Sequence, residues 1–292
     1  MVAPRKRPEI LLKARERTLD LSTPAVMGVL NITPDSFSDG GRFAGPETVD
    51  VDGVVEAAQA MVSAGADILD VGGESTRPGA DPVPAHLEIE RVIPVMERLR
   101  TLDTLLSVDT RKTVVAEAAL AAGCHMVNDV SAAADAGMLE LVASTGAALC
   151  LMHMQGEPQT MQNAPSYDDP VREVAEFLAA RVQAALDAGV TREQLVLDPG
   201  IGFGKALEHN LALVTGAEAL RVAGLPILVG ASRKVVVGKL TGRAVEGRLA
   251  GSLAMALMAV EYGAQIVRVH DVAETKDALN VREALVSYQP SS

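Results

Sequence analysis

The sequence predicts an α/β protein with one domain, a (β/α)8 TIM barrel, and three observations support this fold class. Short apolar runs rich in Val, Ile and Leu recur along the 292 residues, and each is followed by a polar turn and a stretch with helical spacing. The apolar runs are continuous and do not alternate, which is typical of parallel strands covered on both faces. A glycine repeatedly separates a helical stretch from the next apolar run. The alternative, an open doubly wound sheet, needs a switch in strand order of which the sequence gives no sign.

The predicted elements alternate regularly along the chain, eight strands with eight helices. The strands are expected at residues 25–32, 66–72, 105–110, 126–130, 147–153, 195–198, 226–232 and 265–271. Between them, side chains such as Leu207, Leu211 and Val214 are spaced to share one face of a helix. A glycine after a helix fits the left-handed backbone conformation that often ends helices. The glycines expected at such ends are Gly65, Gly123, Gly146, Gly189, Gly224 and Gly263.

Composition and charge narrow the function classes. The chain has 26 Lys and Arg against 38 Asp and Glu, so its formal net charge is −12. This charge argues against a general surface for nucleic acids or anionic membranes. Aromatic residues make up only 2% of the chain, which leaves few rings for stacking on bases. We therefore expect no nucleic acid and no membrane as partner, and an anionic substrate would need a local basic cluster.

The domain organisation and the compartment follow from the same kind of pattern. Residues 1–24 are basic at their start but lack the apolar core and cleavage site of a signal peptide, so we expect an N-terminal surface arm. Residues 25–288 are expected to form the barrel and to carry the catalytic site. No apolar run is long enough to span a bilayer. Cys124 and Cys150 lie in apolar segments without metal-ligand spacing, which favours a reducing, cytoplasmic location.

Polar residues gather where the predicted strands end, the side of a TIM barrel on which active sites lie. They are Asn31, Asp109, Asn128, Asp129, His153, Asp198, Ser232, Arg233, Lys234, Arg268 and His270. Capping of the next helix explains many such residues, and we assign Asp129 and Asp271 to that role. Asp109, Asn128 and Asp198 are expected to point into the barrel mouth, where an unpartnered carboxylate is costly. Two carboxylates and an amide around one cavity suit a flat heterocycle rich in N–H donors.

Two basic clusters follow the last two predicted strands, at 232–234 and 268–270. In TIM barrels the loops after strands seven and eight often bind phosphate, for which Arg and Lys are suitable donors. A solvated surface would explain one isolated lysine. Two clusters at neighbouring strand ends, in a chain of net charge −12, favour an anion site.

The loops add further expectations. The polar, glycine-containing loops at 33–41 and 74–79 are predicted to act as lids over the mouth. The glycine-rich stretch at 200–205 lacks the spacing of dinucleotide-binding and P-loop motifs, which argues against a nucleotide site. The sequence contains no recognisable nucleophile motif and no zinc motif, so we expect chemistry without a covalent enzyme intermediate.

Several of these segments resemble the signatures of the dihydropteroate synthases, a family of pterin-binding enzymes. The resembling motifs are Met27-Gly-Val-Leu-Asn-Ile-Thr-Pro-Asp-Ser-Phe-Ser-Asp-Gly40, Asp70-Val-Gly-Gly-Glu-Ser-Thr-Arg-Pro-Gly79, and residues 107–112, 128–129, 151–155, 197–205, 230–234 and 268–271. The resemblance implies a TIM barrel that condenses 6-hydroxymethyl-7,8-dihydropterin diphosphate with p-aminobenzoate. The products would be 7,8-dihydropteroate and pyrophosphate, a step of folate biosynthesis. It also implies a homodimer, and sulfonamides as competitors of p-aminobenzoate.

The resemblance further implies a role for each matching residue. The pterin would be bound by Asp109, Asn128, Asp198 and Lys234, with Val130 and Met152 packed beside it. Arg268 would stack on the pterin and, with His270, hold the diphosphate, while Asn31 would bind Mg²⁺ as the cofactor. Thr76 and Arg77 would close over the substrate. The p-aminobenzoate pocket would comprise Pro78, Phe203, Ser232 and Lys234.

The reaction that the resemblance implies is SN1-like: the bond to the diphosphate breaks first, and the arylamine nitrogen attacks the pterin cation. Two alternatives share parts of the pattern. A pterin-dependent methyltransferase-like domain would need neither of the two basic clusters nor the loop at 74–79. A non-catalytic pterin-binding paralogue would bind without turnover, but the intact loops at 33–41 and 74–79 argue against it.

Overall fold

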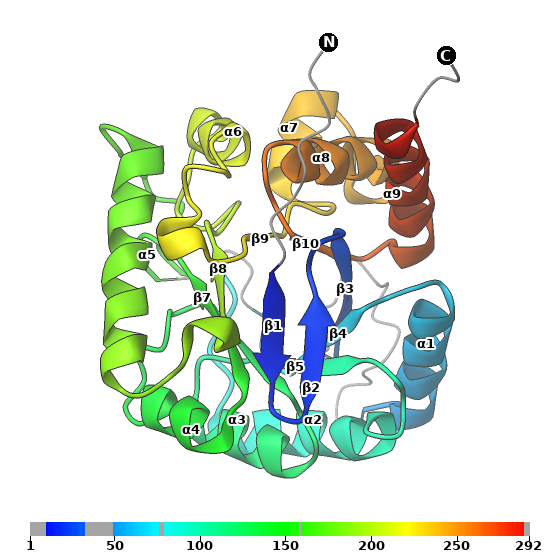
Figure 1. Cartoon of the computed structure of the whole chain (residues 1–292), viewed down its shortest axis with the longest axis vertical. Coiled ribbons are helices and arrows are strands. Elements are labelled where there is room, and N and C mark those ends of the chain that lie inside the picture. Colours follow the sequence, from blue (N-terminus) through cyan, green and yellow to red (C-terminus); the bar gives the residue numbers. More distant parts are fainter. Residues whose placement is uncertain (1–9, 33–48, 76–78, 158, 289–292) are drawn as a thin grey trace.

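Eight parallel strands close into a barrel, and helices surround it (Figure 1). The computed structural model describes residues 10–32, 49–75, 79–157 and 159–288. The barrel strands are β3 (Ala25–Asn31), β4 (Ile68–Gly72), β5 (Leu105–Asp109), β6 (Met126–Asp129), β7 (Ala148–Met152), β8 (Leu195–Asp198), β9 (Leu228–Val229) and β10 (Ile266–Val269). Their order is β8-β7-β6-β5-β4-β3-β10-β9, and a parallel bridge between Leu197 and Ile227 closes the ring. The predicted fold class and all eight predicted strands are therefore confirmed.

The helices lie on the outside of the barrel, and each follows a barrel strand in the chain. They are α1 (Val51–Ser63), α2 (Ala85–Leu99), α3 (Thr113–Ala121), α4 (Met138–Thr145), α5 (Pro170–Asp187), α6 (Leu207–Thr215), α7 (Val235–Thr241), α8 (Leu249–Glu261) and α9 (Val272–Ser287). All six glycines expected at helix ends have positive φ, from 69° to 111°. One connection differs from the expected single helix, because α7 and α8 both follow β9. Gly242, with φ of 69°, ends α7 after seven residues.

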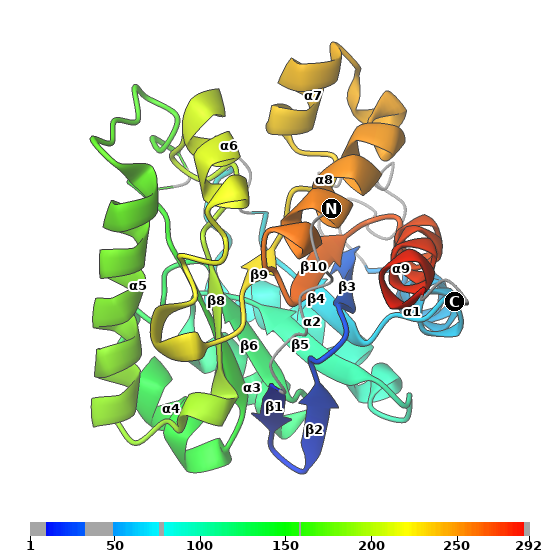
Figure 2. The same ribbon diagram turned by 45° about the horizontal axis from the view of Figure 1, so that its top comes forward.

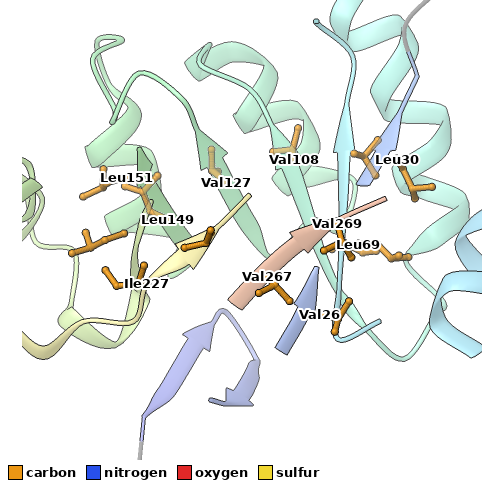
Figure 3. Close-up of a cluster of buried hydrophobic side chains, with 14 of the residues drawn as sticks. Val26, Leu30, Leu69, Val108, Val127, Leu149, Leu151, Ile227, Val267 and Val269 are labelled. Atoms are coloured by element: carbon orange, nitrogen blue, oxygen red, sulfur yellow. The ribbon is translucent and has the colours of Figure 1, made fainter. Parts of the chain in front are cut away.

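Two apolar clusters hold the barrel together, one on each side of its wall. Residues of a strand point alternately to its two faces. Val26, Leu69 and Val108 belong to the cluster between the strands and the helices, part of which Figure 3 shows. Met27 and Ile68, next to them in sequence, belong to the second cluster, which fills the barrel interior at the amino ends of the strands. This interior packing leaves the carboxyl ends as the place for polar side chains.

The N-terminal segment does not form a free surface arm where the structure describes it. From residue 10 it forms an antiparallel hairpin of β1 (Leu11–Ala14) and β2 (Arg17–Asp20) (Figure 1). Leu12 and Ala14 are buried in the interior cluster, so the hairpin closes the amino end of the barrel. Arg15 at its turn donates from Nη1 to the carbonyl oxygens of Leu120 and Cys124, at 2.8 and 2.9 Å. None of the helices within the described ranges is long and apolar enough to span a membrane.

Candidate active site

A cavity of about 820 Å³ lies at the carboxyl ends of the strands. Figure 2 shows the surrounding helices α6 and α7 at one end of the barrel and the β1–β2 hairpin at the other. The cavity wall contains eleven predicted site residues: Asn31, Asp109, Asn128, Val130, Met152, Asp198, Phe203, Ser232, Lys234, Arg268 and His270. Thr76, Arg77 and Pro78, and the predicted lid at 33–41, lie outside the described residues. The structure thus brings together every predicted site residue that it describes.

Arg268 connects two carboxylates at the floor of this cavity. Its Nε donates to Oδ2 of Asp70 at 2.7 Å, and its Nη2 donates to Oδ2 of Asp109 at 2.8 Å. Burial alone would lower the pKa of Arg268, but the two carboxylates outweigh that effect and raise it. The guanidinium of Arg268 is therefore a permanent positive charge in the cavity of a protein whose net charge is negative.

Asp70 is a site residue that the sequence analysis did not assign. It lies on β4 with no exposed surface, and its Oδ2 also accepts from Nδ2 of Asn128 at 2.9 Å. This bond fixes the orientation of the Asn128 amide. The signal in the sequence was a charged residue inside an apolar strand. Because burying a carboxylate without a partner is costly, such a residue implies a cationic or hydrogen-bonding partner in the barrel.

Asp109 and Asp198 keep acceptor capacity that the protein itself does not use fully. Burial raises the pKa of Asp109 to about 7, although Arg268 opposes the shift. Its Oδ1 is buried and has no hydrogen-bond partner among the described residues. Burial also raises the pKa of Asp198, against the opposing charge of Lys234, and its Oδ1 accepts from the N–H of Gly200 at 2.6 Å. A guest with ring N–H groups would supply the missing donors.

The loops after β8 and β9 bring an aromatic ring and a cation together in the cavity. The Nζ of Lys234 donates to the carbonyl oxygen of Ile201 at 2.6 Å and lies 4.5 Å from the centre of the Phe203 ring. Burial lowers the pKa of Lys234 to about 8, although Asp198 opposes the shift. Next to it, Oγ of Ser232 accepts from the backbone N–H of His270 at 3.2 Å. A flat acidic molecule would find an aromatic face and a positive charge here.

Neither predicted helix cap is confirmed. Asp129 accepts the backbone N–H groups of Ser131 and Ala133, at 2.7 and 3.0 Å, and so closes the turn after β6, whereas the next helix, α4, begins at Met138 with Gly137 before it. Asp271 stands directly before α9 but makes no side-chain cap bond, so that prediction is wrong. Its Oδ2 instead accepts from Nε of Arg233 at 2.9 Å. The pair fixes the loop that carries Ser232 and Lys234.

The part of the chain that the structure describes offers few side chains to a metal ion at this cavity. Within the described ranges, no group of three or more His, Cys, Asp or Glu residues could hold one. Asn31 ends β3, and its Oδ1 and the side chain of Asp109 both lie within 4 Å of the point where a Cβ on Gly72 would be. Because Gly72 has no side chain, this space stays open. One amide oxygen suits Mg²⁺ where phosphate oxygens and water complete its ligands.

Comparisons with known proteins agree with this site. The chain matches the family of pterin binding enzymes over residues 27–270. The dihydropteroate synthase of Escherichia coli (strain K12) is 47% identical over 277 residues, which are 94% of this chain and 96% of that protein. The crystal structure of Yersinia pestis dihydropteroate synthase with a sulfonamide drug has a TM-score of 0.91 at 47% identity, and covers 96% of this chain and 100% of that chain.

A third neighbour is Xanthomonas albilineans dihydropteroate synthase with 4-aminobenzoic acid. It has a TM-score of 0.88 at 46% identity and covers 97% of this chain and 100% of that chain. The resemblance found in the sequence motifs is therefore confirmed over nearly the full length. The chain belongs to the pterin binding enzymes and, among them, to the dihydropteroate synthases, transferases of folate biosynthesis.

Proposed function

We propose that the cavity at the carboxyl ends of the strands is where this chain joins 6-hydroxymethyl-7,8-dihydropterin diphosphate to p-aminobenzoate. One observation carries the proposal: two buried carboxylates and an amide share a single cavity with Lys234, Arg268 and His270. The acceptors suit a ring rich in N–H groups, and the cationic side suits a phosphate tail. A molecule with both features matches the cavity as a whole.

Three acceptors would hold the pterin ring. Asp109 and Asp198 would accept its N–H groups, and Asn128, oriented by its bond to Asp70, would align the ring between them. The apolar side chains of Val130 and Met152 would pack against the ring. Because both carboxylates are desolvated, a ring that becomes positively charged during the reaction would be stabilised strongly.

The positive side of the cavity would hold the diphosphate. Arg268 and His270 would bind its oxygens, with Ser232 beside His270. Mg²⁺, when bound with Asn31 as its protein ligand, would neutralise part of the charge on the leaving diphosphate. The carbon–oxygen bond of the substrate would break with its electron pair going to the diphosphate. The arylamine nitrogen would then attack the pterin cation and lose one proton.

Phe203, Ser232 and Lys234 would form the p-aminobenzoate pocket, together with Pro78, and Thr76 and Arg77 would close over the substrates. The support among the described residues is the ammonium of Lys234 beside the Phe203 ring, which suits an aromatic carboxylate. A sulfonamide drug is bound in the Yersinia pestis neighbour, and 4-aminobenzoic acid in the one from Xanthomonas albilineans. We extend both ligands to this chain.

Three further features belong to the proposal. The chain would act as a homodimer, by analogy with its family. It would act in the cytoplasm, where the buried free thiols of Cys124 and Cys150 stay reduced. The chain would be divided into an N-terminal segment, residues 1–24, and a catalytic barrel, residues 25–288, with the β1–β2 hairpin packed against the barrel.

The test is pyrophosphate release from the pterin diphosphate in the presence of Mg²⁺, with and without p-aminobenzoate. We expect release that rises with p-aminobenzoate and equals the dihydropteroate formed. An Asp198→Asn variant serves as the matched control, since it keeps the size of the side chain and removes its charge. Binding of the pterin without either product would overturn the catalytic proposal and favour a non-catalytic paralogue.

A further inference from the structure

Lys205 is a buried lysine at the cavity wall that the proposed reaction does not use. It is only 3% exposed and follows the glycine-rich stretch after β8. Its Nζ contacts three acceptors: the carbonyl oxygen of Phe203 at 2.8 Å, Nδ1 of His153 at 3.0 Å and the carbonyl oxygen of His153 at 3.2 Å. An ammonium has three N–H donors. All three are therefore used within the protein.

The imidazole of His153 is suited to accept a hydrogen bond from the ammonium of Lys205. It follows β7, and its ring is buried against Phe177, with the ring centres 4.9 Å apart. Burial and the nearby charge of Lys205 lower the pKa of His153 to about 3. The imidazole is thus neutral, and Nδ1 accepts when the ring proton is on Nε2. Burial lowers the pKa of Lys205 as well, to about 7, although Asp198 opposes the shift.

These contacts join the loop after β7 to the loop after β8. The two loops are pressed together so closely that side chains do not fit between them. A Cβ on Gly200 would lie 1.9 Å from the carbonyl oxygen of His153, and one on Gly204 would lie 2.3 Å from that of Gln155. Both glycines also have positive φ, of 69° and 60°. The backbone from Gly200 to Gly204 can therefore take only a narrow set of conformations. Lys205 restricts it further by donating to the carbonyl groups of Phe203 and His153.

The consequence reaches the cavity through Phe203. Lys205 donates to the carbonyl group of Phe203, and Lys234 donates to that of Ile201. The Phe203 ring is therefore carried by a segment that two lysines bind, and it faces the ammonium of Lys234. Without the bond to Lys205, the carbonyl of Phe203 would turn more freely and the ring with it. Loss of such positioning affects the ligand that touches the ring more than ligands elsewhere in the cavity.

We propose that Lys205 is a positioning residue for the second substrate, which fixes Phe203 and thereby the pocket for the arylamine. The inference rests on the proposed function, because it takes p-aminobenzoate as the molecule that packs on Phe203. Lys205 acts through Phe203 and not on the reacting atoms. On the pterin side of the cavity, Asp70, Asp109 and Asn128 are bonded to one another and to Arg268, away from this contact, whereas Asp198 interacts with Lys205 through its charge.

The test is a Lys205→Met variant, which keeps the length of the side chain and removes its donors. We expect the KM for p-aminobenzoate and the inhibition constant of a sulfonamide to rise at least tenfold. The Kd of the pterin diphosphate, measured by calorimetry, should rise less than the KM for p-aminobenzoate, because Lys205 affects the ring acceptors only through its charge on Asp198. Lys13→Met, an exposed lysine in the hairpin at the other end of the barrel, is the matched control and should change neither constant.

A double substitution separates positioning from a general loss of structure. If Lys205 acts through Phe203, the Phe203→Ala and Lys205→Met effects on the KM for p-aminobenzoate should not multiply, because the two residues are coupled. Multiplying effects, an unchanged KM, or an equal loss of pterin affinity would each overturn the inference. If methionine prevents folding, Lys205→Gln, which is shorter and has two N–H donors in place of three, is measured instead, and a smaller rise in the KM for p-aminobenzoate is expected. A wild-type chain without turnover would instead refute the proposed function, and arylamine binding by calorimetry would still test Lys205.

Discussion

Replacing Asp109 by asparagine should make the folded chain more stable and at the same time weaken pterin binding severely. Burial is the largest influence on this carboxylate, and its Oδ1 has no partner among the described residues. Asparagine has nearly the same shape but no charge. Its amide oxygen can still accept the bond from Nη2 of Arg268, while Arg268 keeps its second partner, Asp70.

The size of the gain follows from the pKa. For Asp109 it rises from the ordinary 3.8 to about 7, and each pKa unit corresponds to about 1.4 kcal/mol, so ionisation costs the folded state on the order of 4 kcal/mol at pH 8. The new amide N–H groups, if left without acceptors, cost about 1–3 kcal/mol. We therefore expect a net gain of about 1–3 kcal/mol at pH 8.

The gain should depend on pH in a defined direction. Because the folded pKa is raised, the folded wild-type chain binds more protons than the unfolded chain between about pH 4 and pH 7. The contribution of Asp109 to the free energy of unfolding therefore decreases as the pH rises through this range. The variant has no carboxyl group at this position, so its stability does not show this decrease. The difference should favour the variant at pH 8 and should reverse near pH 4, where ionisation of the wild-type carboxyl costs the folded state little and mainly the cost of the amide N–H groups remains.

The assay is denaturant unfolding at pH 4.5 and pH 8, together with calorimetric titration of the pterin diphosphate. Asp129→Asn is the matched control, since Asp129 is also buried but has both oxygens bonded within its own turn. Asparagine there loses an acceptor, so this variant should be less stable. An Asp109→Asn variant that is less stable than wild type at pH 8, or equally changed at both pH values, would refute the reasoning.

Three further substitutions test other parts of the site. Asp198→Asn should raise the Kd of the pterin diphosphate at least tenfold without loss of folding, and near-normal affinity would contradict its role as a ring acceptor. Lys234→Ala should raise the KM of both substrates in steady-state kinetics, and an unchanged value for p-aminobenzoate would exclude it from that pocket. Leu12→Ala, in the hairpin, should lower the free energy of unfolding by about 2–5 kcal/mol and leave both KM values unchanged. A changed KM there would mean that the amino end influences the cavity.

Much of the fold could be predicted because its signals are local. A strand covered on both faces has to be apolar throughout, and all eight such runs became barrel strands. The barrel then brings the strand ends together. A local observation, a polar residue after each apolar run, therefore predicted a site whose residues are far apart in the sequence. This is why Asp109 and Asp198, 89 positions apart in the sequence, could be assigned to one cavity.

The features that were missed depend on partners far away in the chain. The hairpin strands have four residues each, and only packing on the barrel makes Leu12 and Ala14 core residues. Asp271 occupies a capping position, but a distant arginine, Arg233, binds its side chain instead. Lys205 looked like part of a failed nucleotide motif, since nothing near it in sequence indicates His153 as its partner.

Unused hydrogen-bond capacity distinguishes Asp109 from its neighbour Asp129. Asp109 and Asp129 lie at the ends of neighbouring strands, both are buried, and burial raises the pKa of both. Asp129 accepts bonds from its own turn to both of its oxygens, which offset part of the cost of burial and make its carboxylate part of the fold. Asp109 has one oxygen, Oδ1, without a partner among the described residues. Its other oxygen accepts from the guanidinium of Arg268, which also donates to Asp70. Its ionised form is therefore expensive until a donor arrives, and a pterin ring that donates N–H groups and gains positive charge would recover that free energy as binding and catalysis.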